Sequence, residues 1–484
     1  MSDSGRIQIR RCFEQAMISI RTDALNQLTD YCKDMDHGSR RKYISNLIER
    51  ICISGVDDLD LETLKDLLVA KKTQLRSGAD FEVFESLDWP NYVYDLASKA
   101  MVPKNRKDHE EYEIHTINAV QRERLEFIWK SCDTKGIDKI EALLCEHSKK
   151  SRILATIFKD LEDTIYAQDT TGQVIFEITD TTKYEEDAFF FYGGIFLCEG
   201  EYNDGTFTAR KVSLPVLKDE EELPSIIPTD VLNRKPFDAP KNSDCIVILS
   251  DIFLDNQNVI DSLTQLFIGY SEAPPTMFIF CGSFRSVVLD LSKIDDTERD
   301  FQKLEKAMST YRGVYKSTQF VFIAGPKDPP CNGRLPSLLM ESAKSVFASW
   351  SNVHFAANPS KILFKNKVIQ LTRDDVVEKL SQHTFYLSEN ADVGTAFSRT
   401  IWSQRNALPV HPKGSAIRFG DVHDFKIMPD LLVLADQFQP YRWRPPGNEE
   451  NEPKIVNPGV FSIEPFKFMT YYPKDGKIDL NSIH

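Results

Sequence analysis

The residues of this chain that could do chemistry stand where short apolar runs end. These runs are Cys245–Leu249, Met277–Cys281, Phe320–Ala324 and Leu431–Ala435. The polar residues that follow them are Asp251, Gly282 and Ser283, Gly325 to Asp328, and Asp436. Apolar runs that alternate with helical stretches predict a largely parallel sheet, whose site lies at the carboxyl ends of its strands. Carboxylates at such an edge are ligands for divalent metal ions.

A two-metal phosphoesterase is the chemistry that such an edge would serve. It needs carboxylates that bridge two ions and histidines that complete the shell, in the strand-end motifs Asp-x-His, Gly-Asp-x-x-Asp, Gly-Asn-His-Asp/Glu and Gly-His-x-His. In this sequence Phe253 and Phe438 occupy motif positions where a histidine is required, and Ser283 occupies the position of the bridging aspartate. Pro326 replaces the asparagine of the third motif, and Lys327 places a cation where a metal would bind. The sequence therefore predicts a phosphoesterase scaffold without its chemistry.

Other catalytic signatures are absent from the sequence. There is no G-x-x-x-x-G-K-[ST], no G-x-G-x-x-G and no H-E-x-x-H. A nucleophile elbow at Gly269–Ser271 would need a helix directly after the serine, and Pro274 and Pro275 prevent one. Asp58 and Asp60 begin an amphipathic stretch, where acidic residues favour the helix dipole, so we interpret them as capping residues.

Histidines and cysteines indicate no metal site either. No two histidines lie within four residues of each other, and we interpret His411 and His423, which flank a late loop, as surface or core residues. None of the nine cysteines forms a C-x-x-C pair, so we predict a reducing compartment and no disulfide framework. We predict no catalytic residue, no bound metal and no cofactor for this chain.

The charge balance argues against binding of nucleic acid over the whole surface of the protein. The 484 residues include 59 Lys and Arg against 73 Asp and Glu, which gives a formal charge of −14. Hydrophobic residues make up 41% and aromatic residues 11%, which excludes a disordered or fibrous chain. No window reaches the roughly 18 apolar residues of a membrane helix, and the first residues carry no secretory signal, so we expect no membrane contact.

Four segments differ in their sequence pattern. Residues 1–75 carry three amphipathic stripes, which predict a small helical domain. Residues 76–115 are polar and interrupted by prolines, and we predict a linker there. Residues 116–225 combine a helical stretch with about five short strands and an Asp-Gly hairpin signal, which predicts a barrel of the oligonucleotide-binding (OB) type. Residues 226–484 are the predicted α/β sandwich.

The predicted barrel favours contact with protein over contact with single-stranded DNA. It has no evident run of aromatic residues interleaved with Lys and Arg on one face, which single-strand binding needs. The basic clusters elsewhere, Arg40–Lys42, Lys71–Lys72 and Lys104–Lys107, are short and typical of solvated faces.

Five stretches together resemble the B-subunit family of the eukaryotic replicative DNA polymerases. They are Leu249–Asp255, Gly269–Pro275, Phe320–Pro329, Pro429–Asp436 and Asn457–Phe461. The resemblance covers nearly the whole chain, and the helical amino-terminal domain points to the polymerase epsilon members. One segment departs from the family: its Leu-Ser-Gln-x-His-Leu is here Trp402 to Ala407, with Asn406 in place of the histidine. Asn406 is thereby a further degenerate position, beside Asp251, Phe253, Gly282, Ser283, Pro326, Lys327, Asp328, Asp436 and Phe438.

The resemblance implies a non-catalytic accessory subunit in the nucleus. Barrel and inactive calcineurin-like phosphoesterase domain would jointly hold the cysteine-rich, metal-bearing carboxyl-terminal module of the catalytic subunit of DNA polymerase epsilon. The helical amino-terminal domain, similar to the lid domain of AAA+ ATPases, would contact the replicative helicase assembly. Other polymerase epsilon subunits would be partners, and DNA would be reached mainly through the complex. By residue type, Tyr441 and Trp443 are candidate partner contacts; alternatively they cover the sheet edge.

Two other functions stay open from the residues alone. One is an active metal-dependent phosphoesterase with atypical ligands, which would bind Mn or Zn and lose turnover in an Asp251→Ala variant. The other is a single-strand DNA-binding module that works through the barrel.

Overall fold

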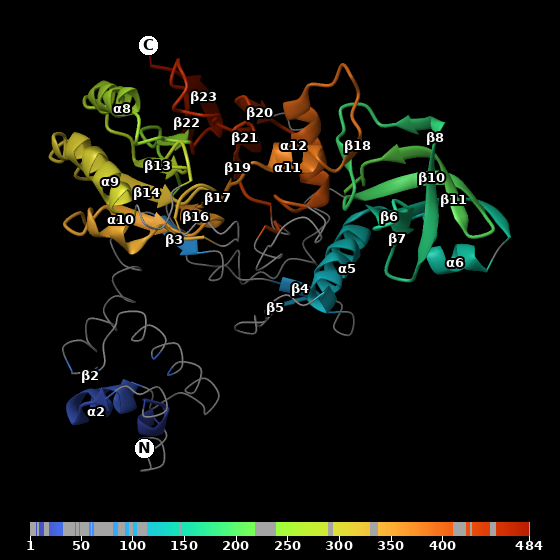
Figure 1. Cartoon of the computed structure of the whole chain (residues 1–484), viewed down its shortest axis with the longest axis horizontal. Helices are drawn as coiled ribbons and strands as arrows, with labels where there is room; N and C mark the ends of the chain where they lie inside the picture. The colour runs from blue at the N-terminus through green and yellow to red at the C-terminus, as the bar shows by residue number, and fades with distance from the viewer. Residues whose placement is uncertain are drawn as a thin grey trace. The chain divides into compact units, whose positions relative to one another are not determined.

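The computed structural model divides the chain into two compact units, Met1–Ala79 and Asp80–His484 (Figure 1). The structure describes residues 6, 9–13, 19–31, 44, 48, 58–59, 61, 81–85, 92–95, 100–103, 114–145, 147–217, 239–288, 294–329, 337–409, 423–425, 428–445 and 452–483. None of the helices in these ranges is long and apolar enough to cross a membrane.

The first unit contains one longer helix among its described residues. Helix α2 (Thr22–Tyr31) buries Ala24, Leu25 and Leu28, as its helical spacing predicts. Strands β1 (Ser19–Ile20) and β2 (Asp58–Leu59) pair in parallel, so Asp58 lies in a strand and not at the start of a helix. The other two of the three amphipathic stripes predicted within residues 1–75 fall almost entirely outside the described residues.

A closed barrel forms the first part of the second unit. Its strands follow the order β10-β11-β8-β7-β6, in which β8 and β11 are parallel and the other pairs antiparallel. Their bounds are β6 (Ser148–Lys159), β7 (Ile165–Gln168), β8 (Gln173–Tyr184), β10 (Ile195–Asn203) and β11 (Thr206–Ser213). Asp204 and Gly205 have positive φ between β10 and β11, so the predicted Asp-Gly hairpin and the five-stranded barrel are confirmed.

Two helices precede the barrel strands. They are α5 (Ile114–Ser131) and α6 (Ile140–Leu144). Ile140 and Leu143 of α6 are buried in the same core cluster as the barrel interior. Asp169 anchors α6, because its Oδ2 accepts the Ile140 N–H at 3.0 Å while its Oδ1 accepts the N–H groups of Thr171 and Gly172. The short helix therefore closes one part of the barrel core.

Two six-stranded sheets form the rest of the second unit. The first has the order β15-β14-β13-β12-β22-β23, and the second has the order β20-β21-β19-β17-β16-β3. The first comprises β15 (Val353–Ala356), β14 (Gln319–Ile323), β13 (Met277–Cys281), β12 (Ile246–Ser250), β22 (Phe468–Tyr472) and β23 (Lys477–Asn481). The second comprises β20 (Tyr441–Trp443), β21 (Ile455–Asn457), β19 (Leu431–Ala435), β17 (Lys367–Arg373), β16 (Ser360–Phe364) and β3 (Phe81–Glu85). The parallel core strands match the prediction, and antiparallel strands flank them in both sheets.

The sheets share one buried core and each carries helices on its other face. Alternate residues of β12 show this, because Ile246 and Ile248 lie in the core between the sheets while Val247 and Leu249 pack with helices. The helices on the first sheet are α8 (Gln257–Gly269), α9 (Ile294–Ser309) and α10 (Glu341–Ser345). The helices on the second sheet are α11 (Val376–Ser381) and α12 (Val393–Gln404).

Part of the predicted linker 76–115 belongs to this sandwich. Strand β3 pairs along its whole length with β16, and β4 (Tyr92–Asp95) pairs with β5 (Ala100–Pro103). Helix α5 also begins inside this segment, at Ile114. The described residues of 76–115 thus form regular structure, and the four-part division of the chain remains a prediction.

Helix α12 joins the sandwich to the barrel through polar contacts. The buried Gln404 side chain donates to the Ile195 carbonyl and accepts the Ile195 N–H, both at 2.8 Å. Thr400 Oγ1 accepts the Phe189 N–H at 2.8 Å, and Arg399 donates to the Glu186 carbonyl at 2.6 Å. Strands β9 (Phe190–Phe191) and β18 (Thr384–Tyr386) add a second link. The barrel and sandwich share one continuous core cluster, so they pack as one body.

Replacing Gln404 by Ala should destabilise this junction. The substitution leaves the buried N–H and carbonyl of Ile195 without partners, which costs roughly 2–4 kcal/mol. Urea denaturation followed by circular dichroism measures the free energy of unfolding. Gln302→Ala, which removes an exposed glutamine of α9, is the matched control and should change it by less than about 0.5 kcal/mol. Equal effects of the two substitutions would contradict the account.

Candidate functional site

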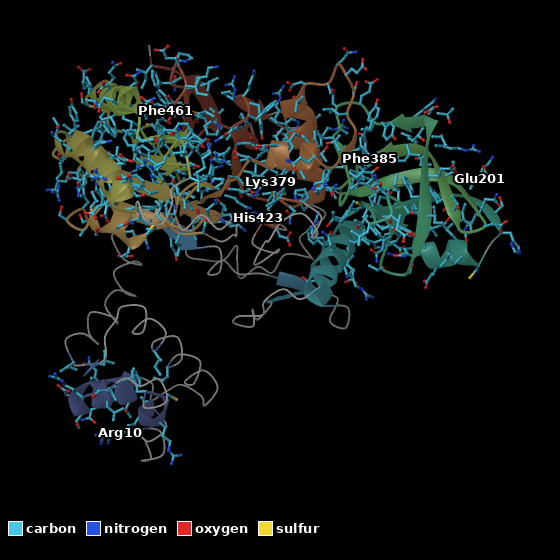
Figure 2. The ribbon with its side chains drawn as sticks, viewed as in Figure 1. Arg10, Glu201, Lys379, Phe385, His423 and Phe461 are labelled. Atoms are coloured by element: carbon cyan, nitrogen blue, oxygen red, sulfur yellow. The ribbon has the colours of Figure 1, made fainter. Side chains whose placement is uncertain are left out.

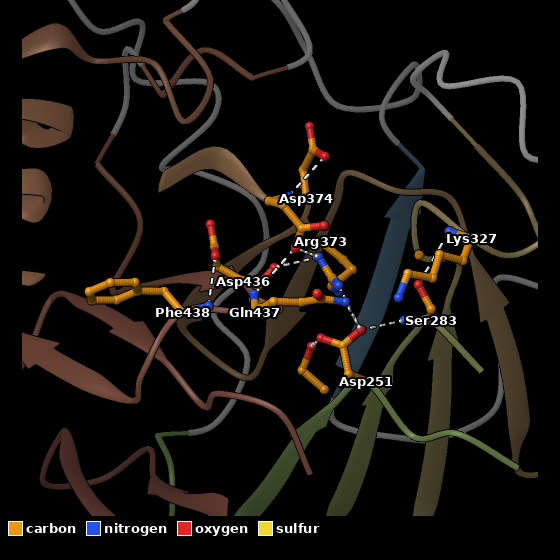
Figure 3. A network of polar contacts seen from close by, with 12 residues as sticks. Asp251, Ser283, Lys327, Arg373, Asp374, Asp436, Gln437 and Phe438 are labelled. Carbon is orange, nitrogen blue, oxygen red and sulfur yellow. Dashed lines mark hydrogen bonds and ion pairs between the residues drawn. The ribbon is translucent and has the colours of Figure 1, made fainter. Parts of the chain in front are cut away.

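The polar residues predicted at the strand ends do meet at one place in the sandwich (Figure 3). Asp251 follows β12, Ser283 follows β13, Lys327 follows β14 and Asp436 follows β19. Strands β12, β13 and β14 are parallel neighbours, which brings their carboxyl ends to one edge of the first sheet. The parallel pair β17 and β19 brings its ends to the same place from the second sheet.

A buried ion pair between Asp251 and Arg373 lies at the centre of this site. Both side chains have no exposed surface, and Arg373 Nη2 donates to Asp251 Oδ1 at 2.6 Å. The same oxygen accepts the backbone N–H of Ser283 at 3.2 Å. The pair joins the two sheets, because Asp251 follows β12 of the first sheet and Arg373 ends β17 of the second.

The other nitrogen atoms of Arg373 are also bonded. Nε donates to the Gly282 carbonyl at 2.6 Å, and Nη1 donates to Asp375 Oδ1 at 2.9 Å and to the Ala435 carbonyl at 3.3 Å. Burial alone would lower the pKa of Arg373, but the carboxylates of Asp251 and Asp375 outweigh it and raise the pKa above its usual value. The guanidinium is therefore a permanent cation at this position.

The loops around the ion pair pack backbone against backbone. A Cβ atom on Gly282 would overlap a carboxyl oxygen of Asp328 and the backbone of Gly325, and one on Gly325 would overlap Ser283. Both positions therefore require glycine. Asp251 has φ 54°, and its N–H donates to the Cys281 carbonyl at 3.0 Å. These contacts hold the ends of β12, β13 and β14 close together.

The Asp328 carboxyl group binds backbone N–H groups of the loops rather than a metal ion. Its two carboxyl oxygens accept the N–H groups of Phe284 and Gly325, each at 2.7 Å. Burial raises the pKa of Asp328 to about 7, because the two N–H donors and the Arg373 charge only partly offset the loss of water. Two backbone donors already occupy the oxygens that a metal would need.

Asp436 is held in the same manner on the second sheet. Its oxygens accept the N–H groups of Val377 and Phe438, each at 2.9 Å. Burial raises the pKa of Asp436 to about 6, although these two N–H groups oppose the rise. Gln437, the next residue, reaches Asp251 Oδ1 with its Nε2 at 3.4 Å.

Lys327 and Phe253 lie at the outer side of the site. The Lys327 ammonium is 5.4 Å from the centre of the Phe253 ring and donates to the Ser286 carbonyl at 3.1 Å. The Lys327 N–H also donates to Ser283 Oγ at 3.2 Å. Phe253, which stands in a predicted histidine position, therefore contacts the Lys327 cation, and the lysine connects two loops.

The arrangement does not fit a two-metal centre. In the part of the chain that the structure describes, no three His, Cys, Asp or Glu side chains gather to hold a metal ion. The carboxyl oxygen of Asp251 that faces the centre is bonded to a guanidinium, and a divalent ion there would meet the charge of Arg373. What these residues can do is hold loops from two sheets in one geometry.

Four of the singled-out residues, Asn406, His423, Tyr441 and Trp443, lie outside this network. Asn406 donates to Asp424 Oδ1 at 2.6 Å and accepts the Leu408 N–H, and His423 is fully buried. Trp443 is 7% exposed, and its ring centre lies 5.6 Å from that of Trp402. Its packing, together with that of the partly buried Tyr441 on Phe397, favours the alternative of a covered sheet edge; a partner contact for the pair stays a prediction.

Sequence reasoning missed Arg373, which is the central residue of the site. Its strand β17, Lys367–Arg373, mixes apolar and polar residues and was not among the predicted strands. Asn358 and Asn457 were missed as well. Asn358 exchanges two hydrogen bonds with the Arg373 backbone, and Asn457 accepts the Asp436 N–H. The consecutive charges Arg373, Asp374 and Asp375, directly before the apolar pair Val376 and Val377, were the available signal.

Removing the Arg373 charge should destabilise the protein strongly. Arg373→Met leaves Asp251 buried without its counter-ion, which costs roughly 3–5 kcal/mol. Adding Asp251→Asn to that variant should restore part of the loss, because the uncompensated charge is then gone. Denaturant unfolding of the full chain measures both. The control Lys327→Met removes an outer cation and should cost less than about 1 kcal/mol; an equally small loss for Arg373→Met would contradict this account.

The raised pKa values predict that stability falls as the pH rises. In an unfolded chain an Asp has a pKa of about 4. Between about pH 4 and 7 the folded state therefore keeps a proton on Asp328 that the unfolded state has already released. The free energy of unfolding of the unmodified chain should therefore fall between pH 5 and 8. For the Asp328→Asn variant, which has no carboxyl group to titrate at this position, that fall should be smaller by roughly 2–3 kcal/mol.

Urea unfolding at several pH values makes this comparison. Asp180→Asn, which changes an exposed carboxylate, should leave the pH dependence as it was. If Asp328→Asn and Asp180→Asn give the same pH profile, Asp328 does not bind its proton in the folded state.

Two family models match this chain. One, which describes the B-subunit of DNA polymerase alpha/epsilon, matches residues 246–442. The other, which describes the OB-fold domain of proteins like DNA polymerase epsilon subunit 2, matches residues 100–216. The five-stranded barrel is therefore an OB-fold, as predicted.

Similar proteins from animals and a plant align along nearly the whole chain. A probable DNA polymerase epsilon subunit 2 of Caenorhabditis elegans is 25% identical over 99% of this chain and 94% of its own length. DNA polymerase epsilon subunit 2 of Mus musculus is 24% identical, with 95% and 93% covered. The DNA polymerase epsilon B-subunit of Arabidopsis thaliana is 22% identical, with 99% of each chain covered. The resemblance that the five sequence stretches indicate is thereby confirmed: models for two parts of the polymerase B-subunits match the chain, and proteins named as the second subunit of DNA polymerase epsilon are similar to it along nearly its whole length.

Proposed function

We propose that the chain is the non-catalytic accessory subunit of DNA polymerase epsilon and works in the nucleus in chromosomal replication. The observation that carries the non-catalytic part is Arg373, whose guanidinium bonds the Asp251 oxygen that a metal would use. The sandwich is on this proposal an inactive calcineurin-like phosphoesterase domain. The relatives that span the same length are named as the second subunit or the B-subunit of DNA polymerase epsilon, which supports the accessory role.

The partner of the barrel and sandwich is the cysteine-rich carboxyl-terminal module of the catalytic subunit. A docking platform has to keep its shape, and the contacts of α12 with the barrel supply that rigidity. The formal charge of −14 complements a basic partner and discourages stray DNA binding. The helical amino-terminal domain, residues 1–75, is the lid-like part that links the polymerase to the replicative helicase assembly, and the other polymerase epsilon subunits complete the set of partners.

The two alternative functions are less well supported by the geometry. An active phosphoesterase would need ligands that Asp328 and Asp436 cannot supply while their oxygens accept backbone N–H groups. A single-strand DNA-binding barrel would need free cations, but several basic side chains of the barrel pair with carboxylates. These pairs are Arg152 with Glu199, Arg210 with Glu201, and Lys149 with Asp138.

Co-expression with the carboxyl-terminal part of the polymerase epsilon catalytic subunit tests the proposal. A stable interface of roughly 1,600 Å² or more should carry a 1:1 complex through affinity purification and gel filtration. The same catalytic fragment without its cysteine-rich module is the matched control and should not co-purify. The purified chain should also show no hydrolysis of a phosphodiester with Mn²⁺ or Zn²⁺.

Two outcomes would contradict the proposal. One is the absence of a complex although both chains are folded. The other is metal-dependent turnover that an Asp251→Ala substitution abolishes, which would establish the phosphoesterase instead.

A further inference from the structure

An apolar row crosses the outer face of the OB barrel, the part of the chain that carries the Glu201 label in Figure 2. Phe158 of β6 is paired with Tyr166 of β7, and Tyr166 is paired with Ile175 of β8. Directly paired residues of antiparallel strands lie on the same side of a sheet. The residues next to them in sequence, among them Ile157 and Ala167, are buried in the barrel core. The row therefore points away from the core, and the rings of Phe158 and Tyr166 stack with their centres 5.6 Å apart.

The turn into β7 adds a leucine that is almost fully exposed. Leu161 is 90% exposed, and Ile175 is 44% exposed. The turn is closed by Asp160, whose Oδ1 accepts the N–H groups of Glu162 and Thr164, each at 2.9 Å. Because the turn is bonded in this way, Leu161 is held in the solvent. We call Leu161, Tyr166 and Ile175 together the β7 surface.

Carboxylates surround the β7 surface. Glu162 is exposed in the turn beside Leu161, and Asp163 is 83% exposed. Glu177 is exposed on β8, two residues after Ile175 and thus on the same side of the strand. Lys159, at the end of β6, forms an ion pair with Asp163 at 2.8 Å. Glu162, Asp163 and Glu177 outnumber Lys159, so the named charges beside the apolar side chains are net negative.

This face is the one that other OB barrels use for ligands. Their second and third strands, with the loops between strands one and two and between strands four and five, bind oligonucleotides and oligosaccharides. Here those strands are β7 and β8, and the Ile175 N–H donates to the Gly205 carbonyl in the β10–β11 turn at 3.2 Å. Aromatic and apolar contacts are present, but carboxylates stand where a phosphate backbone would need cations.

We propose that the β7 surface docks a basic segment of a protein partner, with a bulky apolar side chain packing on Leu161, Tyr166 and Ile175 and flanking Lys or Arg meeting Glu162, Asp163 and Glu177. Charge complementarity favours a basic protein segment over the other candidate ligands of this surface. A phosphate backbone is repelled by the carboxylates, and a second copy of this chain carries a formal charge of −14. The proposal concerns a surface of the barrel and not the Asp251 site, and its peptide test does not depend on whether the catalytic subunit is the partner.

Two synthetic peptides test the proposal on the full chain by fluorescence anisotropy. One is an amphipathic peptide of Leu and Lys, and the other has Glu in place of every Lys. The Lys peptide should bind, more weakly as salt rises, and the Glu peptide should not. The double variant Leu161→Ala with Ile175→Ala should weaken binding about tenfold, because two apolar contacts are lost. Glu162→Gln with Glu177→Gln should weaken it at low salt and much less at high salt.

The matched control removes two exposed aliphatic side chains elsewhere. Ile268 and Val314 are 52% and 40% exposed, and Ile268→Ala with Val314→Ala should leave binding unchanged. All variants should keep the melting temperature of the unmodified chain, because the substituted side chains are exposed. The proposal is overturned if the Lys peptide does not bind, or if it binds the Leu161 and Ile175 variant as tightly as the control. Binding of a single-stranded oligonucleotide that depends on Leu161 would also overturn it, in favour of nucleic acid.

Discussion

The buried ion pair between Arg373 and Asp251 is the interaction that the sandwich depends on. The guanidinium bonds the Asp251 carboxylate, the Gly282 carbonyl, Asp375 and the Ala435 carbonyl, so one side chain connects loops from both sheets. Removing a charge from water is costly, and this cost is offset only because nearly every donor of the guanidinium has a partner. The same bonds prevent Asp251 from binding a metal ion. On the proposed non-catalytic function, the stability of the sandwich and the lack of a metal site at Asp251 have one physical cause.

Rigidity is the second property that follows from this architecture. The glycines at 282 and 325 let loop backbones pack directly on each other, and Asp328 and Asp436 accept backbone N–H groups in the places where an enzyme would bind ions. The Gln404 side chain, at the end of α12, also forms two hydrogen bonds with the backbone of Ile195 in the barrel. The sandwich and the barrel thus form one body that shares a core cluster, and this rigidity suits the docking function that we propose.

Local signals could predict the core strands, but not the contacts between distant segments. The apolar runs at 277–281 and 431–435 match β13 and β19 to the residue, since parallel strands buried on both faces are continuously apolar. Strand β17 carries polar residues between apolar ones, and its end residue Arg373 was missed. Strand β3 was placed in a linker, because only its pairing with the distant β16 makes Phe81–Glu85 a strand. The strand-end residues, Lys327 among them, were predicted to meet, but the central Arg373 was not predicted.

The measurement that tests the central claim most directly is a crystal structure of the chain grown or soaked with Mn²⁺, with anomalous difference maps at the Asp251 site. The account predicts no anomalous peak within bonding distance of Asp251, and Arg373 Nη2 at hydrogen-bonding distance from its carboxylate. A Mn²⁺ peak bound to Asp251, with the Arg373 side chain displaced, would contradict it.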